Sequence, residues 1–388
     1  MPASSSSPIS PVIDQLQAVG TSLGDDLPDA LTVLNAIGDT RRRRGVRHQL
    51  AAVLGLALCA VLAGARSFVA IAEWAADADR ATLARLGIWE TVPCESTFRR
   101  VLQSLDAQAL DDSLGEWSLA RSQPVADMQR VIAIDGKTLR GSARGDEPGR
   151  HLLAAFDHTH GVVLGQVDVE AKTNEIPMFS TLLDPIPLVG AVVTADAMHA
   201  QRAHADYLHG RGAHFVFTVK RNQPKLHAQL AGLPWRDVPV GDLTRDRGHG
   251  RIETRQLKVT AVSIGLLFPH AAQAIQIRRR RRSLTSNRWS TETVYAVTSL
   301  TPRDAGPQQL ADIVRGHWKI EDQLHWVRDV TFDEDRSQIR TCNGPRVMAT
   351  LRNLAISVLR LTGATNIAAA LRYHARRPHR PLQTIMTC

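Results

Sequence analysis

Two aspartates at the ends of apolar segments are the first residues whose type and position suggest chemistry. Asp135 follows Val-Ile-Ala-Ile at residues 131–134, and Asp196 follows Ala-Val-Val-Thr-Ala at residues 191–195. Each segment is typical of a buried strand, and open α/β sheets bind their ligands where such strands end. One aspartate in this position is usually a turn residue. Two of them in one predicted sheet favour a functional site.

A third carboxylate, Glu321, lies within a helical pattern that runs from Gln308 to Arg328. At about 100° per residue, Glu321 shares one stripe with His317, His325 and Arg328, beside an apolar stripe. The pattern therefore predicts an acidic helix that follows the strands in the sequence.

Two tryptophans, Trp318 and Trp326, flank the predicted acid. Large aromatic side chains are uncommon on a helix surface that is fully solvated. We therefore expect the helix to bury its apolar stripe against the sheet and to hold Glu321 at the margin of the core. The alternative is a solvated charged face.

Three carboxylates that converge from two strand ends and a helix form an oxygen-rich site suited to Mg²⁺ or Mn²⁺. Two such ions about 4 Å apart activate water or a 3′-hydroxyl and stabilise the leaving oxygen of a phosphodiester. Nearby basic residues would then neutralise the phosphate backbone. The candidates for this role are Lys137, Arg140, Lys220, Arg221 and Arg328.

Other chemistries lack support in the sequence. Gly136-Lys137-Thr138 follows a strand, but a phosphate-binding loop needs a glycine at position 131, which is Val131. No GxGxxG or GxSxG motif is present. The four cysteines are far apart and form no CxxC pair, which argues against a disulfide scaffold and a structural zinc site.

Composition favours a nucleic-acid partner. The 388 residues suggest two to three domains, and 44% hydrophobic content allows a sizeable core. The net charge is +9, and arginine supplies 41 of the 47 basic residues. Arginine is the better bidentate phosphate ligand. The uncharged run Leu50–Ala65 is slightly short for a membrane span, and no basic leader precedes an apolar stretch, so we expect a soluble intracellular protein.

Helical patterns dominate the first third of the chain. Residues 1–28 begin with a Ser/Pro-rich stretch and are expected to be flexible, and residues 29–122 are expected to be helical. The segment Cys94–Leu102 predicts a short helix that carries Arg99 and Arg100 outward. Such a helix after two others is similar to the reading element of a helix-turn-helix, although an ordinary surface helix explains it equally well.

Residues 128–365 predict a mixed α/β domain in which strands alternate with helices, with a hairpin at Asp157–Gly161. Residues of about 228–290 interrupt the rhythm with short alternating segments, which indicates a mostly β insertion before the acidic helix. Arg346–Leu361 predicts a further helix. The basic tail 366–388 is expected to fray around Arg376–Arg380.

Several further residues are weaker candidates. Asn174 and Glu175 could line the site, although an N-cap explains Asn174 equally well. The run Arg278–Arg282 is interpreted as a phosphate-contacting or solvated edge rather than a base reader. DNA contacts and a solvated hairpin are equally good explanations for His249, Arg251 and Arg255. Three acids could be mistaken for the third ligand: Asp329, Glu334 and Asp335.

Taken together, the motifs of this chain resemble the bacterial insertion-sequence transposases of the H-repeat-associated group, a branch of the DDE transposases. The resemblance covers nearly the whole chain. In the first part it rests on Asp39-Thr-Arg-Arg-Arg-Arg-Gly-Val-Arg-His48, Ala63-Gly-Ala-Arg-Ser67 and Ile71-Ala-Glu-Trp74. In the later part it rests on Ile134-Asp-Gly-Lys137, Lys172-Thr-Asn-Glu-Ile176, Thr194-Ala-Asp-Ala-Met-His199, Asn222-Gln-Pro224, His249-Gly-Arg-Ile-Glu-Thr-Arg255, Arg315-Gly-His-Trp-Lys-Ile-Glu321, Leu324-His-Trp326, Asp329-Val-Thr-Phe332 and Glu334-Asp335.

The resemblance implies an RNase-H-like core in which Asp135, Asp196 and Glu321 are the catalytic, metal-binding triad. The insertion fits in the longer gap, between the second and third acids. In the broader superfamily, a tyrosine lies seven residues before the glutamate and an arginine lies four residues before it. A lysine lies seven residues after it. This chain has Val314, His317 and Arg328 there. His317 and Arg328 are therefore given supporting roles.

The implied function is that of a DNA transposase. It would bind the terminal inverted repeats of an insertion sequence, cleave each end with Mg²⁺ or Mn²⁺ (two ions), and transfer the strand to target DNA. The resemblance also implies a homodimer that pairs two DNA ends, in the bacterial cytoplasm and associated with the nucleoid. One alternative is a catalytically inactive relic that only binds DNA. Another is a general nuclease, which would cleave without dependence on terminal repeats.

Overall fold

The computed structural model describes residues 27–42, 44, 46–124, 128–170, 174–248, 250–262, 265–285 and 288–388. Residues 1–26 of the segment that was expected to be flexible, 1–28, therefore lie outside the described residues. The chain divides into two compact units. The first unit contains Met1–Val125, Gly136–Asn174 and Glu321–Cys388, and the second contains Ala126–Asp135 and Glu175–Ile320.

The described part of the first unit begins with six helices, four of which have an N-terminus capped by a side chain. Asp29, Ser67, Asp79 and Asp106 each accept a hydrogen bond from a backbone N–H in the first turn that follows. These caps satisfy donors that a helix start otherwise leaves unpaired. The helices are α2 (Ala30–Ala36), α3 (Leu50–Leu62), α4 (Phe68–Asp77), α5 (Arg80–Arg85), α6 (Glu95–Ser104) and α7 (Ala107–Arg121).

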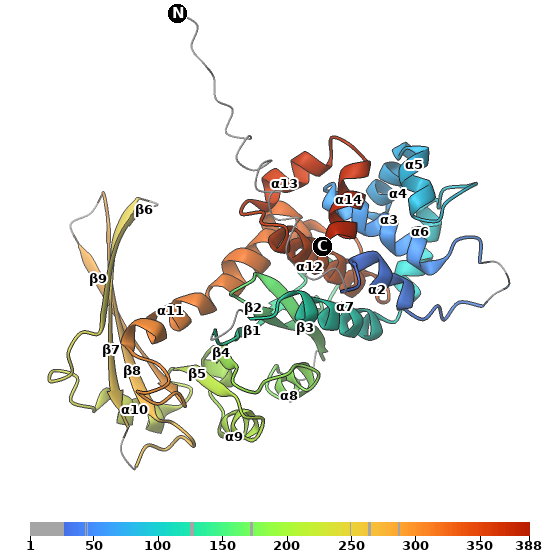
Figure 1. Ribbon diagram of the computed structural model, residues 1–388. Coiled ribbons are helices and arrows are strands. Elements are labelled where there is room, and N and C mark those ends of the chain that lie inside the picture. Colours follow the sequence, from blue (N-terminus) through green and yellow to red (C-terminus); the bar gives the residue numbers. More distant parts are fainter. Residues whose placement is uncertain are drawn as a thin grey trace, which may run out of the picture. The chain divides into compact units, whose positions relative to one another are not determined.

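Helix α3 forms much of the core of the first unit. All of its residues except Ala51 are buried, which confirms that the uncharged run from Leu50 is a core helix. The later helix α12 (Gly344–Leu361) packs against α3, α6 and α7 and against strand β3 (Val162–Val169) (Figure 1). Within the described residues, no helix combines the length and the apolarity needed to cross a membrane.

A buried ionic cluster joins α12 to α7 and β3. Arg346 of α12 donates to Asp111 at 2.8 Å and to Asp168 at 2.9 Å. Thr350, one turn along, donates to the other oxygen of Asp111 at 2.6 Å. Burial raises the pKa of Asp111 to about 6, against the opposing effect of the Arg346 charge. These contacts fix how α12 lies against its neighbours.

The last residues of the chain are folded, which corrects the expectation of a frayed tail. They form α13 (Ile367–His374) and α14 (His379–Thr387), and α14 packs against α3 and α12. The basic residues Arg376 and Arg377 occupy the turn between these helices. The apolar residues Leu382 and Ile385 are fully buried. The charge of the turn suggested a solvated tail, but the spacing of the apolar residues that follow it is that of a packed helix.

Shortening the buried Ile385 is expected to destabilise the protein measurably. Ile385→Val removes one methylene from a fully buried position and should lower the free energy of unfolding by about 1 kcal/mol. Urea denaturation followed by circular dichroism measures the change. Gln383→Ala, at an exposed position of the same helix, is the control and should leave the midpoint unchanged. Equal midpoints for the two variants would show that α14 does not pack.

The protein has a mixed α/β fold with one large mixed sheet, as the sequence predicted. The hydrogen-bonded strand order is β3-β2-β1-β4-β5-β9-β8-β7-β6. Strand β1 (Val131–Thr138) continues from the second unit into the first. Strand β2 (His151–Asp157) forms the predicted antiparallel hairpin with β3. In the second unit, β4 (Val192–Ala195) pairs in parallel with both β1 and β5 (His214–Val219). The helices that accompany these strands are α8 (Met178–Leu183), α9 (Arg202–Gly210) and α10 (Pro224–Ala231).

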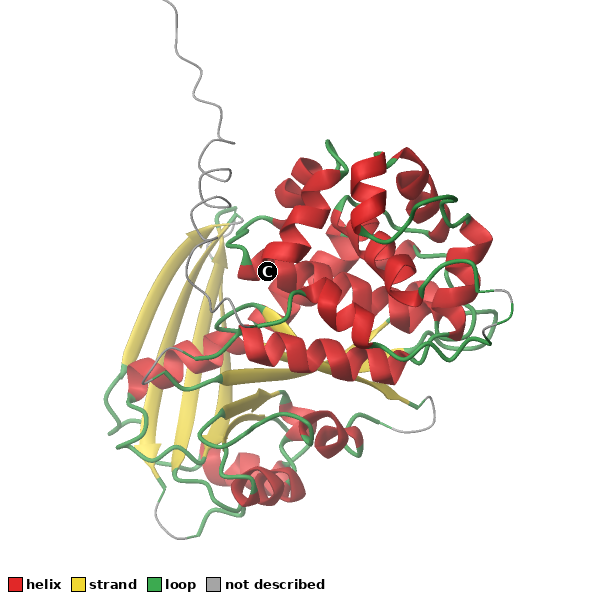
Figure 2. Ribbon diagram, turned by 45° about the vertical axis from the view of Figure 1, so that its right-hand side comes forward, coloured by secondary structure: helices red, strands yellow, loops and turns green. Residues whose placement is uncertain are grey.

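The region predicted as a β insertion contains long antiparallel strands, which lie side by side (Figures 1 and 2). The strands extend well beyond the apolar segments that marked them in the sequence, because their polar halves continue to pair. Their apolar halves pack against α11 (Pro307–His317) through residues such as Leu257, Ile275 and Leu310. The strands are β6 (Asp242–Gly248), β7 (Arg251–Ala261), β8 (Gln273–Ser283) and β9 (Trp289–Thr298).

The predicted helix Gln308–Arg328 is not one regular α-helix. After α11 ends at His317, the chain forms two π-helical segments, Ile320–His325 and Val327–Thr331. A π-helix has wider turns than an α-helix, so residues beyond Ile320 leave the 100° periodicity. The expected single stripe of His317, Glu321, His325 and Arg328 is therefore wrong as a whole. Glu321 does contact His325, but Arg328 is buried, and these environments are described separately below.

Candidate active site

Asp135 and Asp196 follow paired residues of two parallel strands. The last paired residues of β1 and β4 are Ile134 and Ala195. Because the strands run in the same direction, Asp135 and Asp196 each lie one residue further along the same edge of the sheet. Both are partly exposed after buried strand residues. Strand β4 ends just before Asp196, as expected, but β1 continues past Asp135 to Thr138, so the expectation that Asp135 ends its strand is wrong. Asp196 also accepts a hydrogen bond from the backbone N–H of Met198 at 2.8 Å, which starts a turn of 3₁₀-helix.

His317, at the end of α11, lies in the electrostatic field of these two aspartates. Its Nδ1 is 3.0 Å from the hydroxyl oxygen of Thr194, a residue of β4. Burial lowers the pKa of His317, while the negative charges of Asp135 and Asp196 oppose that shift. The imidazole is therefore held neutral near the strand ends, where it can hydrogen-bond without adding positive charge.

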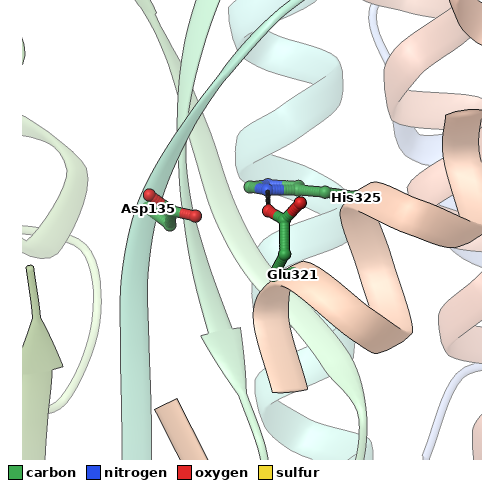
Figure 3. A group of neighbouring side chains, drawn as sticks. All are labelled: Asp135, Glu321 and His325. Carbon is green, nitrogen blue, oxygen red and sulfur yellow. Dashed lines mark hydrogen bonds and ion pairs between the residues drawn. The ribbon is translucent and has the colours of Figure 1, made fainter. Parts of the chain in front are cut away.

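Glu321 lies in the first π-helical segment and is paired with a buried histidine. Nδ1 of His325 is 3.1 Å from a carboxylate oxygen of Glu321, and the side chain of Glu321 is half exposed (Figure 3). The hydrogen bond from His325 lowers the pKa of Glu321, and the charge of Lys137 adds to this effect. Glu321 is therefore a carboxylate near neutral pH.

Two side chains of the first unit offer metal ligands beside each other. Glu321 offers a carboxylate oxygen and His325 an imidazole nitrogen, and the two groups point toward one another (Figure 3). Asp135 and Asp196 belong to the second unit. His325 was predicted only as a companion on the helix stripe, and its spacing of four residues from Glu321 was the signal for a direct contact. Oxygen ligands with one imidazole suit a divalent cation such as Mn²⁺ or Mg²⁺.

Lys137 is buried and paired, which corrects its expected role as a free phosphate ligand. It lies two residues after Asp135 in β1, so the two side chains share one face of the strand. Its ammonium group contacts the carboxylate of Asp329 at 2.6 Å. Asp329, considered as a rival for the third acid, thus neutralises Lys137. Lys137 remains close enough to influence the pKa of Glu321.

Arg328 is also unsuited to contact DNA, because its side chain is fully buried. Its guanidinium donates to Glu334 at 2.9 Å and to Asn353 at 3.2 Å. Arg352 of α12 donates to the other oxygen of Glu334 at 2.8 Å. Burial alone would raise the pKa of Glu334, but the two guanidiniums lower it to about 2. Arg328 and Glu334 therefore form part of the core rather than of a DNA-binding surface.

Lys220 and Arg221 are exposed cations at the same sheet edge as the two aspartates. They directly follow β5, which runs parallel to β4 and ends beside it. The exposed Arg140 lies in the first unit, 3.6 Å from a carboxylate oxygen of Asp335. These three residues keep a solvent-facing charge that phosphate could use.

The remaining predicted residues occupy different environments. Arg99 and Arg100 are exposed on α6, where Arg99 pairs with Glu95 at the preceding turn. Arg251 and Arg255 contact the buried Glu253 of β7. His249 lies outside the described residues.

Glu175 is a partner of the loop after Asp196 rather than an exposed site residue. Its carboxylate is 2.9 Å from Nε2 of His199, and both side chains are buried. His199 belongs to the turn that Asp196 caps. The pair therefore fixes the backbone that follows the second aspartate. The clustering of Thr194 to His199 was visible in the sequence, but no spacing rule linked it to Glu175.

Trp318 and Trp326 are exposed, in contrast to the expectation drawn from them. Their exposed fractions are 55% and 54%. Both large aromatic side chains are therefore solvated, and the expectation that they would not be is wrong. Glu321, which lies between them in the first π-helical segment, is half exposed.

Comparison with known proteins places the chain in a family. A family model described as "Transposase DDE domain" matches residues 127–358, and a second, described as "DDE_Tnp_1-associated", matches residues 31–118. The chain belongs to the DDE transposase family. The family model spans the strands and helices that carry Asp135, Asp196 and Glu321.

Relatives within this family match most of the chain. "Putative transposase YncI" of Escherichia coli O157:H7 is 32% identical over 85% of this chain and 87% of its own length. "H repeat-associated putative transposase YhhI" of Escherichia coli K12 is 28% identical over 86% and 91%. These relatives confirm the resemblance to the H-repeat-associated group. A solved piggyBac transposase complex with hairpin DNA covers 93% of this chain at a TM-score of 0.41 and 11% identity. A score this low does not establish a shared fold.

Proposed function

We propose that this DDE transposase family member binds the terminal inverted repeats of a bacterial insertion sequence, cleaves the DNA at each end and transfers the freed strand to target DNA. The observation that carries the proposal is the position of two aspartates on the same edge of parallel strands β1 and β4, one residue past the last pair. The family match over residues 127–358 supports it, because that family is named for such acids.

We propose Asp135, Asp196 and Glu321 as the catalytic acids that bind Mg²⁺ or Mn²⁺, as two ions. The donor set fits these ions, because carboxylate oxygens are the ligands that they prefer and His325 adds an imidazole nitrogen beside Glu321. When bound, such ions supply activation of water or a 3′-hydroxyl and stabilisation of the leaving oxygen. The hydrogen bond from His325 keeps Glu321 ionised and oriented. The turn capped by Asp196 and held by Glu175 and His199 fixes the second acid.

The proposed core is RNase-H-like. The strand order β3-β2-β1-β4-β5, with a β2–β3 hairpin and parallel β1, β4 and β5, supports this assignment. In the same proposal, residues 29–122 form an all-α DNA-binding region and residues 128–365 the catalytic domain, with an insertion at about 228–290. Exposed Arg99 and Arg100 on α6 support the first role, and Lys220 and Arg221 support phosphate contact beside the acids.

The proposed partners are the element's double-stranded ends, target DNA and a second copy of the chain. A dimer is proposed because two ends must be cut and joined in a coordinated way. A bacterial DNA substrate would place the protein in the cytoplasm, associated with the nucleoid. The net charge of +9 supports association with DNA.

Removal of divalent metal is expected to stop cleavage without stopping DNA binding. The test uses purified protein and a labelled duplex that carries the flanking inverted repeat. With EDTA we expect no nicked product, and with added Mg²⁺ or Mn²⁺ we expect cleavage and strand transfer, because three carboxylates without a cation would repel the phosphodiester. A duplex with scrambled repeats is the control. Cleavage that persists in EDTA, or that ignores the repeats, would contradict the proposal.

A further inference from the structure

The two faces of the sheet formed by β6–β9 carry very different charge. The register of these antiparallel strands is continuous, so each residue can be assigned to a face. Directly paired residues share a face, and neighbours along a strand point to opposite faces. Glu253 pairs with Arg281, and the next residue, Thr254, pairs with Arg280. The two pairs therefore lie on opposite sides of the sheet.

The face that contains Glu253 is electrically balanced. Glu253 is only 4% exposed, and its carboxylate is 3.1 Å from Arg279 and 3.1 Å from Arg281. The apolar end of this face packs against α11. Its acids equal its arginines in number. The acids are Asp242, Asp246, Glu253 and Glu292, and the arginines are Arg251, Arg255, Arg279 and Arg281.

The opposite face, which we call the arginine face, has only positive charge. No carboxylate lies on it within these four strands, all of whose residues the structure describes. Near one end it is covered by the segment after α10, where Trp235 stacks on Tyr295 with ring centroids 6.1 Å apart and Lys258 donates to a backbone carbonyl. Its arginines lie beyond that covered end: Arg245, Arg247, Arg278, Arg280 and Arg282.

A tryptophan orders part of this charge. Trp289 pairs directly with Arg282 in the register of β8 and β9. The guanidinium of Arg280 lies 5.0 Å from the centre of the Trp289 ring, and that of Arg282 lies 5.4 Å from it. Cation–π contacts at these distances restrict the arginine rotamers without neutralising the charge. Arg280 is exposed to solvent, and Arg282 is partly exposed.

Like charges that share one face of a sheet repel, and an anionic partner would relieve that repulsion. We propose that the arginine face binds the phosphate backbone of double-stranded DNA. This inference rests on the proposed function, because that function makes duplex DNA the anion that the protein meets. Alternate residues on a strand are about 6.7 Å apart, so Arg278 to Arg282 span roughly 13 Å. A duplex carries one phosphate per about 1.7 Å of its axis, which gives several phosphates in this span.

Of the two groups of arginines that the sequence suggested in this region, the DNA contact falls on part of the run Arg278–Arg282 and not on Arg251 and Arg255. Arg251 and Arg255 were candidates, but they lie on the balanced face and contact Glu253. Their charge is already matched within the protein. The run Arg278–Arg282 is split by the pleat, so that only Arg278, Arg280 and Arg282 reach the arginine face.

The test compares full-length variants on a fluorescent duplex by anisotropy, in EDTA so that no strand is cut. Arg278→Gln, Arg280→Gln and Arg282→Gln combined should weaken binding by on the order of 10- to 100-fold. The slope of log affinity against log salt should become shallower by about 2 to 3. The same three positions changed to lysine should keep affinity within a few-fold. Melting by circular dichroism checks that each variant is folded.

A matched pair of single variants locates the effect. Arg280→Gln and Arg251→Gln each remove one exposed arginine from the same four strands, but from opposite faces. We expect weaker binding only for Arg280→Gln. Unchanged affinity in the triple glutamine variant, or equal loss in both single variants, would overturn the assignment. The same variants are also measured on a fluorescent single-stranded RNA. If the glutamine substitutions weakened binding to that RNA and left binding to the duplex unchanged, the assignment would also be overturned. Because binding is measured without metal, an absence of cleavage counts against the proposed function alone.

Discussion

Asp135→Asn is expected to lower the rate of DNA cleavage by roughly 10³-fold or more while DNA affinity stays near that of the wild type. The substitution keeps the size of the side chain but removes the negative charge that a divalent cation requires. Asparagine has nearly the same shape as aspartate and can keep its place within β1, so the fold should not change. Asp196→Asn and Glu321→Gln should have the same effect, because all three acids are proposed to act as one unit.

Gel assays of nicking and strand transfer on repeat-bearing DNA measure this effect, with anisotropy as the readout of binding. Asp322→Asn provides the matched control, because Asp322 is an exposed acid next to Glu321 and is not one of the three proposed catalytic acids. It should cleave at the wild-type rate. If Asp135→Asn cleaved as fast as Asp322→Asn, Asp135 could not be a metal ligand. If the wild type bound the repeats and never cleaved them, a DNA-binding relic would be the better description.

Glu334→Gln is expected to lower the free energy of unfolding by about 3 to 5 kcal/mol. Glu334 is buried between Arg328 and Arg352, whose side chains are each about 1% exposed. Removing its charge leaves two guanidiniums in the core without a counterion, and each would have to be desolvated without compensation. Urea denaturation measures the loss. Arg66→Gln is the control, because its ion pair with Asp333 is largely exposed and should contribute less than about 1 kcal/mol.

The carboxylate of Glu334 should also make the free energy of unfolding depend on pH. Its pKa falls from an ordinary 4.5 to about 2 in the folded protein. The stabilisation is therefore fully present above about pH 4.5 and is lost as the pH falls toward 2. The glutamine variant should lack this part of the acid sensitivity. Parallel acid-unfolding curves for the two proteins would contradict the assigned role of Glu334.

The strands that carry the two aspartates could be predicted from the sequence because they depend on local patterns, although β1 continues to Thr138 instead of ending at Asp135. The apolar run before Asp135 and the one before Asp196 are short and uninterrupted, as expected for strands buried on both faces. Once both runs are strands of one parallel sheet, the aspartates must emerge at one edge. The two apolar runs and the common direction of parallel strands were sufficient to predict that the two aspartates lie on one edge of the sheet.

The surroundings of Glu321 could not be predicted in the same way. Periodicity gives the angle between residues only while the helix stays regular, and the π-helical winding from Ile320 changes that angle. Periodicity also does not show which part of the protein packs against a given face of the helix. Arg328 was expected to reach DNA, but its partners are Glu334 and a residue of α12, Asn353. Those contacts depend on tertiary packing that no pattern within the segment encodes.

The order of synthesis gives α3 a particular vulnerability. This helix is almost entirely apolar, and it is complete once the ribosome has passed Leu62. Helices α12 and α14, which cover part of it, begin only at Gly344 and His379. At about 5 to 20 residues per second, the nascent chain therefore carries an incompletely covered hydrophobic helix for roughly 15 to 60 seconds. Premature termination before α12 would leave the part of α3 that α12 and α14 cover uncovered in the released product.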